Sequence, residues 1–188
     1  MPLRLGTRAS ALAQWQANWT AAQLRQVGHE VELVLIKTHG DATQEMSSQA
    51  NEGAPIGSMG SVGVFTKELQ KALLENRIDL AVHSLKDLPT DAVDGLLLAS
   101  VPERETVFDV LISRDEKKLD QLPFNSTVGT GSLRRRAQLL YLRPDLRMVD
   151  IRGNVDSRLR KLQDGQFDAI VLAEAGICLL YTSPSPRD

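Results

Sequence analysis

The stretch of sequence that decides the fold spans residues 127–173 and reads TVGTGSLRRRAQLLYLRPDLRMVDIRGNVDSRLRKLQDGQFDAIVLA. Its short apolar runs predict strands, and the segments between them have the spacing of amphipathic helices. The predicted elements are, in order, a strand at 127–130, a helix at 132–142, a strand at 147–151, a helix at 154–162 and a strand at 169–173. Because alternating strands and helices need crossover connections, this stretch predicts a largely parallel sheet of the α/β class.

The residues before this stretch repeat the alternation. Their predicted elements are helices from residue 11 to about 27 and at 64–76, and strands at 2–6, 31–37, 79–84, 96–101 and 107–112. The first helix carries apolar residues at helical spacing, which gives it one face made of Leu12, Trp15, Trp19 and Ala22. The chain is therefore expected to contain a second α/β unit ahead of residue 127.

A polar break separates the two units. Residues 102–105 lie between apolar runs and predict a hinge, with one α/β lobe at 1–102 and another at 103–177. Two small lobes joined by a hinge usually place a ligand in the cleft between them. Residues 178–188, which read CLLYTSPSPRD, break the pattern and match one reading frame of a common sequencing adapter. We interpret them as a non-native tail, the alternative being a natural disordered terminus.

Composition argues against several classes of function. The 188 residues carry 22 Lys+Arg against 24 Asp+Glu, and a net charge of −2 does not suit a general nucleic-acid binder. No apolar run reaches the roughly 20 residues that cross a bilayer, and no signal peptide is recognisable. The single Cys cannot form an internal disulfide, which fits a protein of the reducing cytosol. The three His residues are scattered, which argues against a dedicated metal site. We therefore expect a cytoplasmic monomer that binds no metal, nucleic acid or membrane.

Arginines gather at predicted turns between strands and helices. Arg8 precedes the first helix, Arg134 and Arg135 begin a helix of the second lobe, and Arg152 and Arg158 flank the start of the next. A cation there opposes the helix dipole by about 0.3–1 kcal/mol unless an anion is shared with the free backbone N–H groups. Strand-end turns lie on the ligand side of open α/β sheets, so the pattern predicts a ligand with several carboxylates or phosphates. For the arginine run at 134–136 the alternative is a solvated basic face.

A second constellation ends the apolar strand predicted at 79–84 and reads HSLKDLP from His83 to Pro89. Lys86 and Asp87 are thereby held at the expected edge of the cleft. Adjacent opposite charges are often only a solvated pair. A carboxylate that faces several cations is nevertheless suited to stay ionised and to stabilise developing positive charge.

Four motifs together resemble one known family. They read LGTRASALA from Leu5, HSLKDLP from His83, VGTGSLRR from Val128 and RGNVDSRL from Arg152. Their order and spacing, from about residue 3 to residue 177, resemble porphobilinogen deaminase, also called hydroxymethylbilane synthase. The resemblance implies two periplasmic-binding-protein-like lobes with an interlobe cleft, and a third α+β domain that is absent here.

The resemblance also implies an activity. Members of the family join four porphobilinogen units head to tail, with loss of ammonia, into a linear hydroxymethylbilane for tetrapyrrole and haem synthesis. A covalently bound dipyrromethane cofactor serves as the primer. Each pyrrole carries an acetate and a propionate, so the substrate has the several carboxylates that the expected anion sites would bind.

Site roles carry over to matching positions. The resemblance implies that Asp87 contacts pyrrole N–H groups and stabilises the cationic azafulvene that forms when ammonia leaves. It implies substrate or cofactor binding by Arg8, Ser10, Phe65, Ser84, Lys86, Thr130, Ser132, Arg134, Arg135, Arg152 and Arg158. The glycine-rich residues at about 43–63 match the family's mobile lid over the active site.

The sequence departs from the family at several positions. Gly131 stands where members commonly have Ser, and Val62 where many have Lys. The family attaches dipyrromethane to a Cys of the third domain, and Cys178 does not correspond to that residue. We therefore expect this fragment to be inactive by itself. Two alternatives are a two-lobed binding protein for a small polycarboxylate and an RNA or DNA binder, the second disfavoured by net charge and few aromatics.

Overall fold

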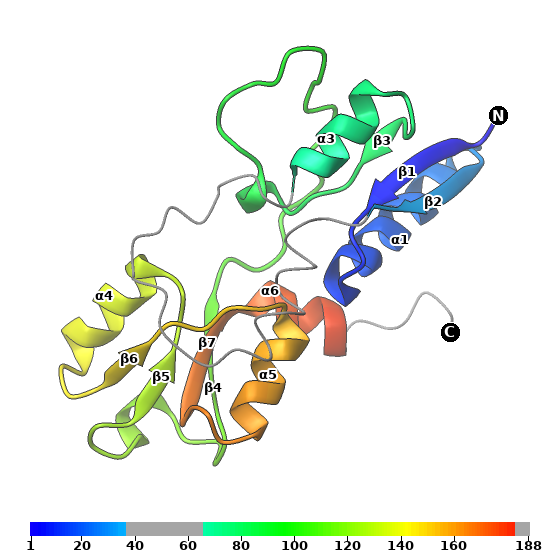
Figure 1. The fold of residues 1–188 in the computed structure, drawn as a ribbon. Helices are drawn as coiled ribbons and strands as arrows, with labels where there is room; N and C mark the ends of the chain where they lie inside the picture. The colour runs from blue at the N-terminus through cyan, green and yellow to red at the C-terminus, as the bar shows by residue number, and fades with distance from the viewer. Residues whose placement is uncertain (37–65, 183–188) are drawn as a thin grey trace. The chain divides into compact units, whose positions relative to one another are not determined.

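The computed structural model describes residues 1–36 and 66–182, which belong to two compact units (Figure 1). Unit 1 is Met1–Glu103 and unit 2 begins at Arg104. Both units combine a β-sheet with helices, so the predicted α/β class is confirmed. The predicted lid at about 43–63 lies outside the described residues.

Unit 1 has a three-stranded parallel sheet with strand order β2-β1-β3. Its strands are β1 (Leu3–Thr7), β2 (Val31–Leu35) and β3 (Leu80–Ala81). Strand β1 lies at the centre, with Leu5 opposite both Leu33 and Leu80. This register brings the carboxyl ends of β1 and β3 to one edge of the sheet.

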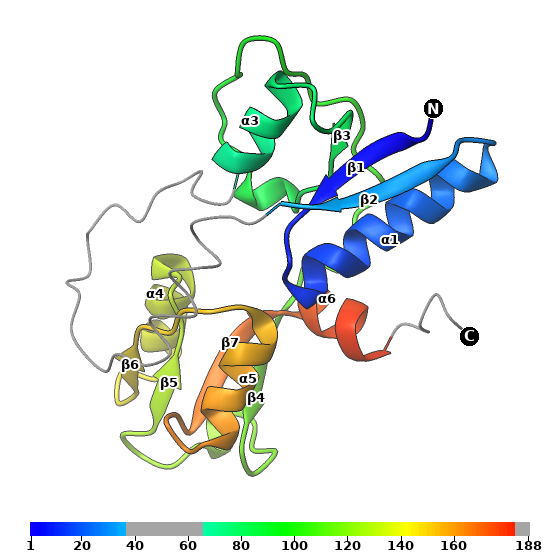
Figure 2. The same ribbon diagram turned by 45° about the vertical axis from the view of Figure 1, so that its right-hand side comes forward.

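Two helices cover opposite faces of this sheet, as both ribbon views show (Figure 2). Helix α1 (Ala11–Gln26) packs Ala17 and Ala21 against Leu5. Helix α3 (Lys67–Leu74) packs Leu69 and Ala72 on the other face, in a separate apolar cluster. Alternate side chains of a strand point to opposite faces, so each face of the sheet has its own core.

The buried face of α1 differs from the face made of Leu12, Trp15, Trp19 and Ala22. Ala17 and Ala21 are fully buried, whereas Trp19 is 39% exposed. Small side chains let a helix approach a sheet closely, and this helix has apolar residues on more than one side. The spacing that marks a helix therefore did not identify the side that packs.

The strand predicted at 96–101 is wrong. No ladder forms there, and Leu97 and Leu98 are 82% and 60% exposed. An apolar run becomes a strand only when a neighbouring strand pairs with it, and the described part of unit 1 offers none to this run. Strand β3 is also shorter than predicted, because only Leu80 and Ala81 pair with β1.

Unit 2 has a four-stranded mixed sheet with strand order β4-β7-β5-β6. The strands are β4 (Asp109–Ser113), β5 (Thr127–Gly129), β6 (Arg147–Val149) and β7 (Ala169–Ala173). Strands β5, β6 and β7 are parallel, and β4 pairs antiparallel with β7. The predicted strand–helix alternation over 127–173 is confirmed.

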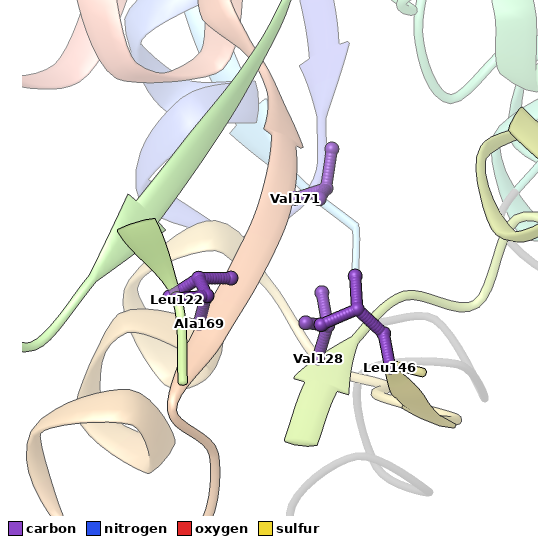
Figure 3. Packing of buried hydrophobic residues seen from close by; sticks show 5 residues of the cluster. All are labelled: Leu122, Val128, Leu146, Ala169 and Val171. Atoms are coloured by element: carbon purple, nitrogen blue, oxygen red, sulfur yellow. The ribbon is translucent and has the colours of Figure 1, made fainter. Parts of the chain in front are cut away.

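Two apolar clusters cover the two faces of the unit 2 sheet, because β7 alternates its side chains between them. One cluster holds Val128, Ala169 and Val171 with Leu122 and Leu146, as Figure 3 shows. Helix α4 (Leu133–Leu142) adds Leu139 to this cluster. The other cluster packs α5 (Val155–Gln163) on Ile170 and Leu172.

Short helical segments complete the described chain. They are η1 (Leu85–Asp87), η2 (Leu119–Gln121), α6 (Glu174–Ile177) and the π-helical η3 (Cys178–Thr182). Leu179 of η3 is buried. The interpretation of 178–188 as a non-native tail stays a prediction. Within the described residues, no helix has the length and apolar character needed to cross a membrane.

Candidate functional site

One edge of the unit 1 sheet collects the predicted residues of the first lobe. Arg8 and Ser10 follow β1, while Ser84 and the turn η1, which holds Lys86 and Asp87, follow β3. Because β1 and β3 are adjacent and parallel, these segments leave the sheet at the same edge. Lys86 and Asp87 are exposed and available to a ligand.

Side-chain hydrogen bonds fix the two segments. The Thr7 hydroxyl, fully buried, donates to the carbonyl of Ala13 at 3.0 Å, and Ser10 Oγ accepts from the Ala13 N–H at 3.4 Å as the N-cap of α1. Ser84 Oγ lies 3.1 Å from Gln16 Nε2, which donates to it. Gln16 therefore ties α1 to the segment that carries Asp87. Sequence reasoning missed Gln16, because nothing in the pattern joins residues so far apart.

His83 belongs to the segment that follows β3, directly before Ser84. Burial lowers the pKa of His83 below its usual 6.5, with Asp87 raising the pKa and Arg8 lowering it in smaller measure. Arg8 and Asp87 are thus both close enough to act on one imidazole. Burial thus favours the neutral form of the His83 imidazole.

One edge of the unit 2 sheet collects the predicted residues of the second lobe. Helices α4 and α5 begin just beyond the carboxyl ends of β5 and β6, which are adjacent and parallel. Thr130 is buried, and its Oγ1 accepts from the Ser132 N–H at 3.2 Å. Ser132 Oγ in turn accepts from the Arg135 N–H at 3.4 Å as the N-cap of α4. These hydrogen bonds fix the start of α4, and with it the backbone positions of Arg134 and Arg135 in its first turn.

Arg134 and Arg135 share one carboxylate. Arg134 Nη2 donates to Asp109 Oδ2 at 3.1 Å, and Arg135 Nη2 donates to Asp109 Oδ1 at 2.6 Å. Arg135 Nη1 also donates to the carbonyl of Val171 at 3.2 Å. Burial acts to raise the pKa of Asp109, but the hydrogen bonds and charges of the two arginines outweigh it, so the pKa lies below its usual value.

Arg152 and Arg158 are held at the start of α5. Arg152 Nε donates to Asp150 Oδ2 at 3.2 Å, and Arg158 Nε donates to the carbonyl of Gly153 at 2.8 Å. Burial lowers the pKa of Arg158, as does the charge of Arg135, while Asp150 opposes the shift. The like charges of Arg135 and Arg158 therefore act on each other.

The predicted residues come together as two sets, one in each unit. The unit 1 set contains Arg8, Ser10, Ser84, Lys86 and Asp87. The unit 2 set contains Thr130, Ser132, Arg134, Arg135, Arg152 and Arg158. Phe65 lies outside the described residues, and the interlobe cleft stays a prediction. Sequence reasoning missed Asp109 and Asp150, the carboxylates that hold Arg134, Arg135 and Arg152.

The unit 2 set is suited to bind anions. It carries four guanidinium groups against the two carboxylates of Asp109 and Asp150, and helix N-termini add backbone donors. Within residues 1–36 and 66–182, no group of three or more His, Cys, Asp or Glu side chains is placed to hold a metal ion.

Sequence comparisons identify relatives of the whole chain. A family model described as porphobilinogen deaminase, dipyromethane cofactor binding domain, matches residues 3–184. The porphobilinogen deaminase of Nitratiruptor sp. is 50% identical over 187 residues, covering 100% of this chain and 58% of that protein. The porphobilinogen deaminase of Geobacter metallireducens is 50% identical over 177 residues, covering 93% of this chain and 53% of that protein. The chain thus spans a little over half the length of these curated relatives.

Solved structures add a weaker likeness. An ancestral arginine-binding protein bound to glutamine aligns at 14% identity and a TM-score of 0.43, covering 97% of this chain and 74% of that chain. A likeness of that strength carries no weight for fold or function. The family model, in contrast, spans all four motifs and confirms the resemblance they gave. The chain belongs to the porphobilinogen deaminase family.

Proposed function

We propose that the complete protein is a porphobilinogen deaminase, which joins four porphobilinogen units head to tail into a linear hydroxymethylbilane. The observation that carries this proposal is the gathering of four arginines at one edge of unit 2, three of them held by two carboxylates and the fourth by a backbone carbonyl. Relatives that bear this enzyme's name match nearly all of the chain. They do not favour the alternative of a polycarboxylate-binding protein.

The unit 2 arginines bind the acidic arms of the substrate in this proposal. Porphobilinogen carries an acetate and a propionate, both ionised at neutral pH. Arg134 and Arg152 have side chains 63% and 61% exposed, which leaves donors for a ligand. A guanidinium fork binds a carboxylate through two parallel hydrogen bonds. Arg135 and Arg158, more deeply placed, keep the surrounding potential positive.

Asp87 is the proposed catalytic residue. The aminomethyl group of porphobilinogen is an ammonium at neutral pH, so when its C–N bond breaks the electron pair leaves with nitrogen and the group departs as neutral ammonia. The pyrrole is left as an azafulvene cation. The exposed Asp87 carboxylate accepts hydrogen bonds from the pyrrole N–H and stabilises that cation electrostatically.

The donors present also fit a dipyrromethane cofactor. Its side chains are acetates and propionates like those of the substrate, and both edges offer cations and hydroxyls that match them. Arg134, Arg152 and Ser132 of unit 2 would hold its carboxylates. When bound, dipyrromethane supplies the primer to which the substrate units are joined.

A chimaera tests this function. Residues 3–177 of this chain replace the matching part of the Nitratiruptor porphobilinogen deaminase, which supplies the remaining sequence. We expect the chimaera to consume porphobilinogen and release hydroxymethylbilane, with the unaltered relative as the control. A folded chimaera that forms no hydroxymethylbilane would contradict the proposal.

A further inference from the structure

Asp109 lies between two arginines that have different exposures. Its Oδ1 accepts from Arg135 at 2.6 Å and its Oδ2 accepts from Arg134 at 3.1 Å. The Arg135 side chain is 15% exposed, whereas that of Arg134 is 63% exposed. The Asp109 carboxylate therefore binds the largely buried guanidinium of Arg135 and also contacts the guanidinium of Arg134, which remains open to solvent.

The location of Asp109 makes it a rigid partner. It is the first residue of β4, and its backbone lies opposite Ala173 of β7 in the antiparallel ladder. Arg135 has a second contact on the same strand pair, because its Nη1 donates to the carbonyl of Val171. Two fixed acceptors thus determine the position of the Arg135 guanidinium. A side chain locked in this way loses less freedom when a ligand binds beside it.

The positive charges around Arg135 are a second reason why Asp109 matters for its position. Arg134 and Arg135 follow one another at the positive end of α4, and the charge of Arg158 also reaches Arg135. Like charges so close repel each other unless an anion lies among them. Asp109 is the carboxylate that contacts both Arg134 and Arg135, so its removal would let them separate.

We propose that Asp109 is a positioning residue, which holds Arg135 in place and directs Arg134 toward a substrate carboxylate. This inference rests on the proposed function, because porphobilinogen is the ligand that the arginines would receive. Asp109 itself does not touch the substrate. A purely electrostatic view predicts the opposite effect, since loss of a negative charge should strengthen anion binding.

Arginine side-chain NMR of the 188-residue chain tests the positioning. In the unaltered chain, we expect the Nη–H groups of Arg135 to exchange slowly with water. In Asp109→Asn that exchange should become about tenfold faster, the factor expected for the loss of one charge-assisted hydrogen bond. Backbone amide signals of β4 and β7 report whether the fold is intact. Unchanged Arg135 exchange in a folded variant would overturn the proposal.

A porphobilinogen titration of the same samples tests the consequence. The dissociation constant should rise about tenfold in Asp109→Asn. The matched control is Asp168→Asn, which removes a carboxylate that accepts from Arg114 at 2.7 Å at the opposite end of β7 and should leave binding unchanged. Equal or tighter binding by Asp109→Asn would overturn the proposal.

The two proposals fail in different ways. If the folded chimaera formed no hydroxymethylbilane, the proposed function would fail, while the Arg135 exchange rates would still decide whether Asp109 positions the arginines. If Asp109→Asn does not fold, Asp109→Glu and Asp109→Gln compare the same change of charge at equal side-chain length. Slow exchange in the Glu variant alone supports the proposal, and equal exchange in both overturns it.

Discussion

Gly131 and Asp150 lie in such close contact that a β-carbon on residue 131 would come within 3.0 Å of Asp150 Oδ1. The same β-carbon would lie 3.2 Å from the carbonyl oxygen of Ile151. Because Gly131 has no side chain, the Asp150 carboxylate can occupy the position in which it accepts a hydrogen bond from Arg152. A Ser at this position would require the carboxylate to shift.

Substitution of Gly131 by Ala is expected to destabilise the chain. Overpacking against Asp150 and the neighbouring carbonyl should lower the free energy of unfolding by about 1 kcal/mol. Urea denaturation measures this change. In an Asp150→Ala background the cost should shrink, because one of the two crowded atoms is gone. An equal cost in both backgrounds would show that Asp150 is not the obstacle.

Acid should weaken the folded state through Asp145. The hydrogen bond from Arg143 is the main reason why the pKa of Asp145 falls from 3.8 to about 2 in the fold. A depressed folded pKa contributes stability that is present above the unfolded value and is lost as pH falls from about 4 toward 2. Urea unfolding at a series of pH values should therefore show a steeper acid loss for the unaltered chain than for Asp145→Asn. Parallel curves for the two proteins would contradict this linkage.

The 188-residue chain by itself should not sustain turnover. The family attaches its dipyrromethane primer to a Cys of another domain, and the single Cys here is Cys178, directly after α6. Without an attached primer the growing chain has no fixed start. A porphobilinogen consumption assay should give a flat trace for the chain and a rising one for the chimaera. Steady consumption of many equivalents by the chain alone would refute this expectation.

Asp87→Ala should collapse turnover of the chimaera while its fold is retained. The carboxylate is exposed, so its loss costs little stability, but the cation that forms on departure of ammonia loses its stabilising charge. A fall in kcat of roughly 100-fold or more is expected for the loss of such a group. Asp91→Ala, another exposed carboxylate nearby, is the matched control. Near-normal kcat in Asp87→Ala would remove this residue from the mechanism.

The sequence predicted the fold class and most elements, but not which surfaces meet. The helical spacing of apolar residues located α1. It could not show that Ala17 and Ala21 pack against the sheet while Trp19 stays 39% exposed. The same limit made 96–101 look like a strand, since an apolar run does not reveal whether a partner strand exists.

The candidate site shows a similar division. The arginines could be found because a cation at a helix N-terminus is locally unfavourable and calls for an explanation. Asp109 could not, because it lies 25 and 26 residues before Arg134 and Arg135, and the antiparallel pairing of β4 with β7 brings it to them. That pairing is a long-range register, which no local pattern encodes.

The central claim is that the unit 2 arginines bind the carboxylates of porphobilinogen, and calorimetric titration of the 188-residue chain tests it most directly. Saturable binding is predicted, with Arg134→Leu and Arg152→Leu each raising the dissociation constant about tenfold. Arg114→Leu, which removes a guanidinium bound to Asp168 instead, should leave it unchanged. Absence of binding, or equal affinity in all three variants, would contradict the account.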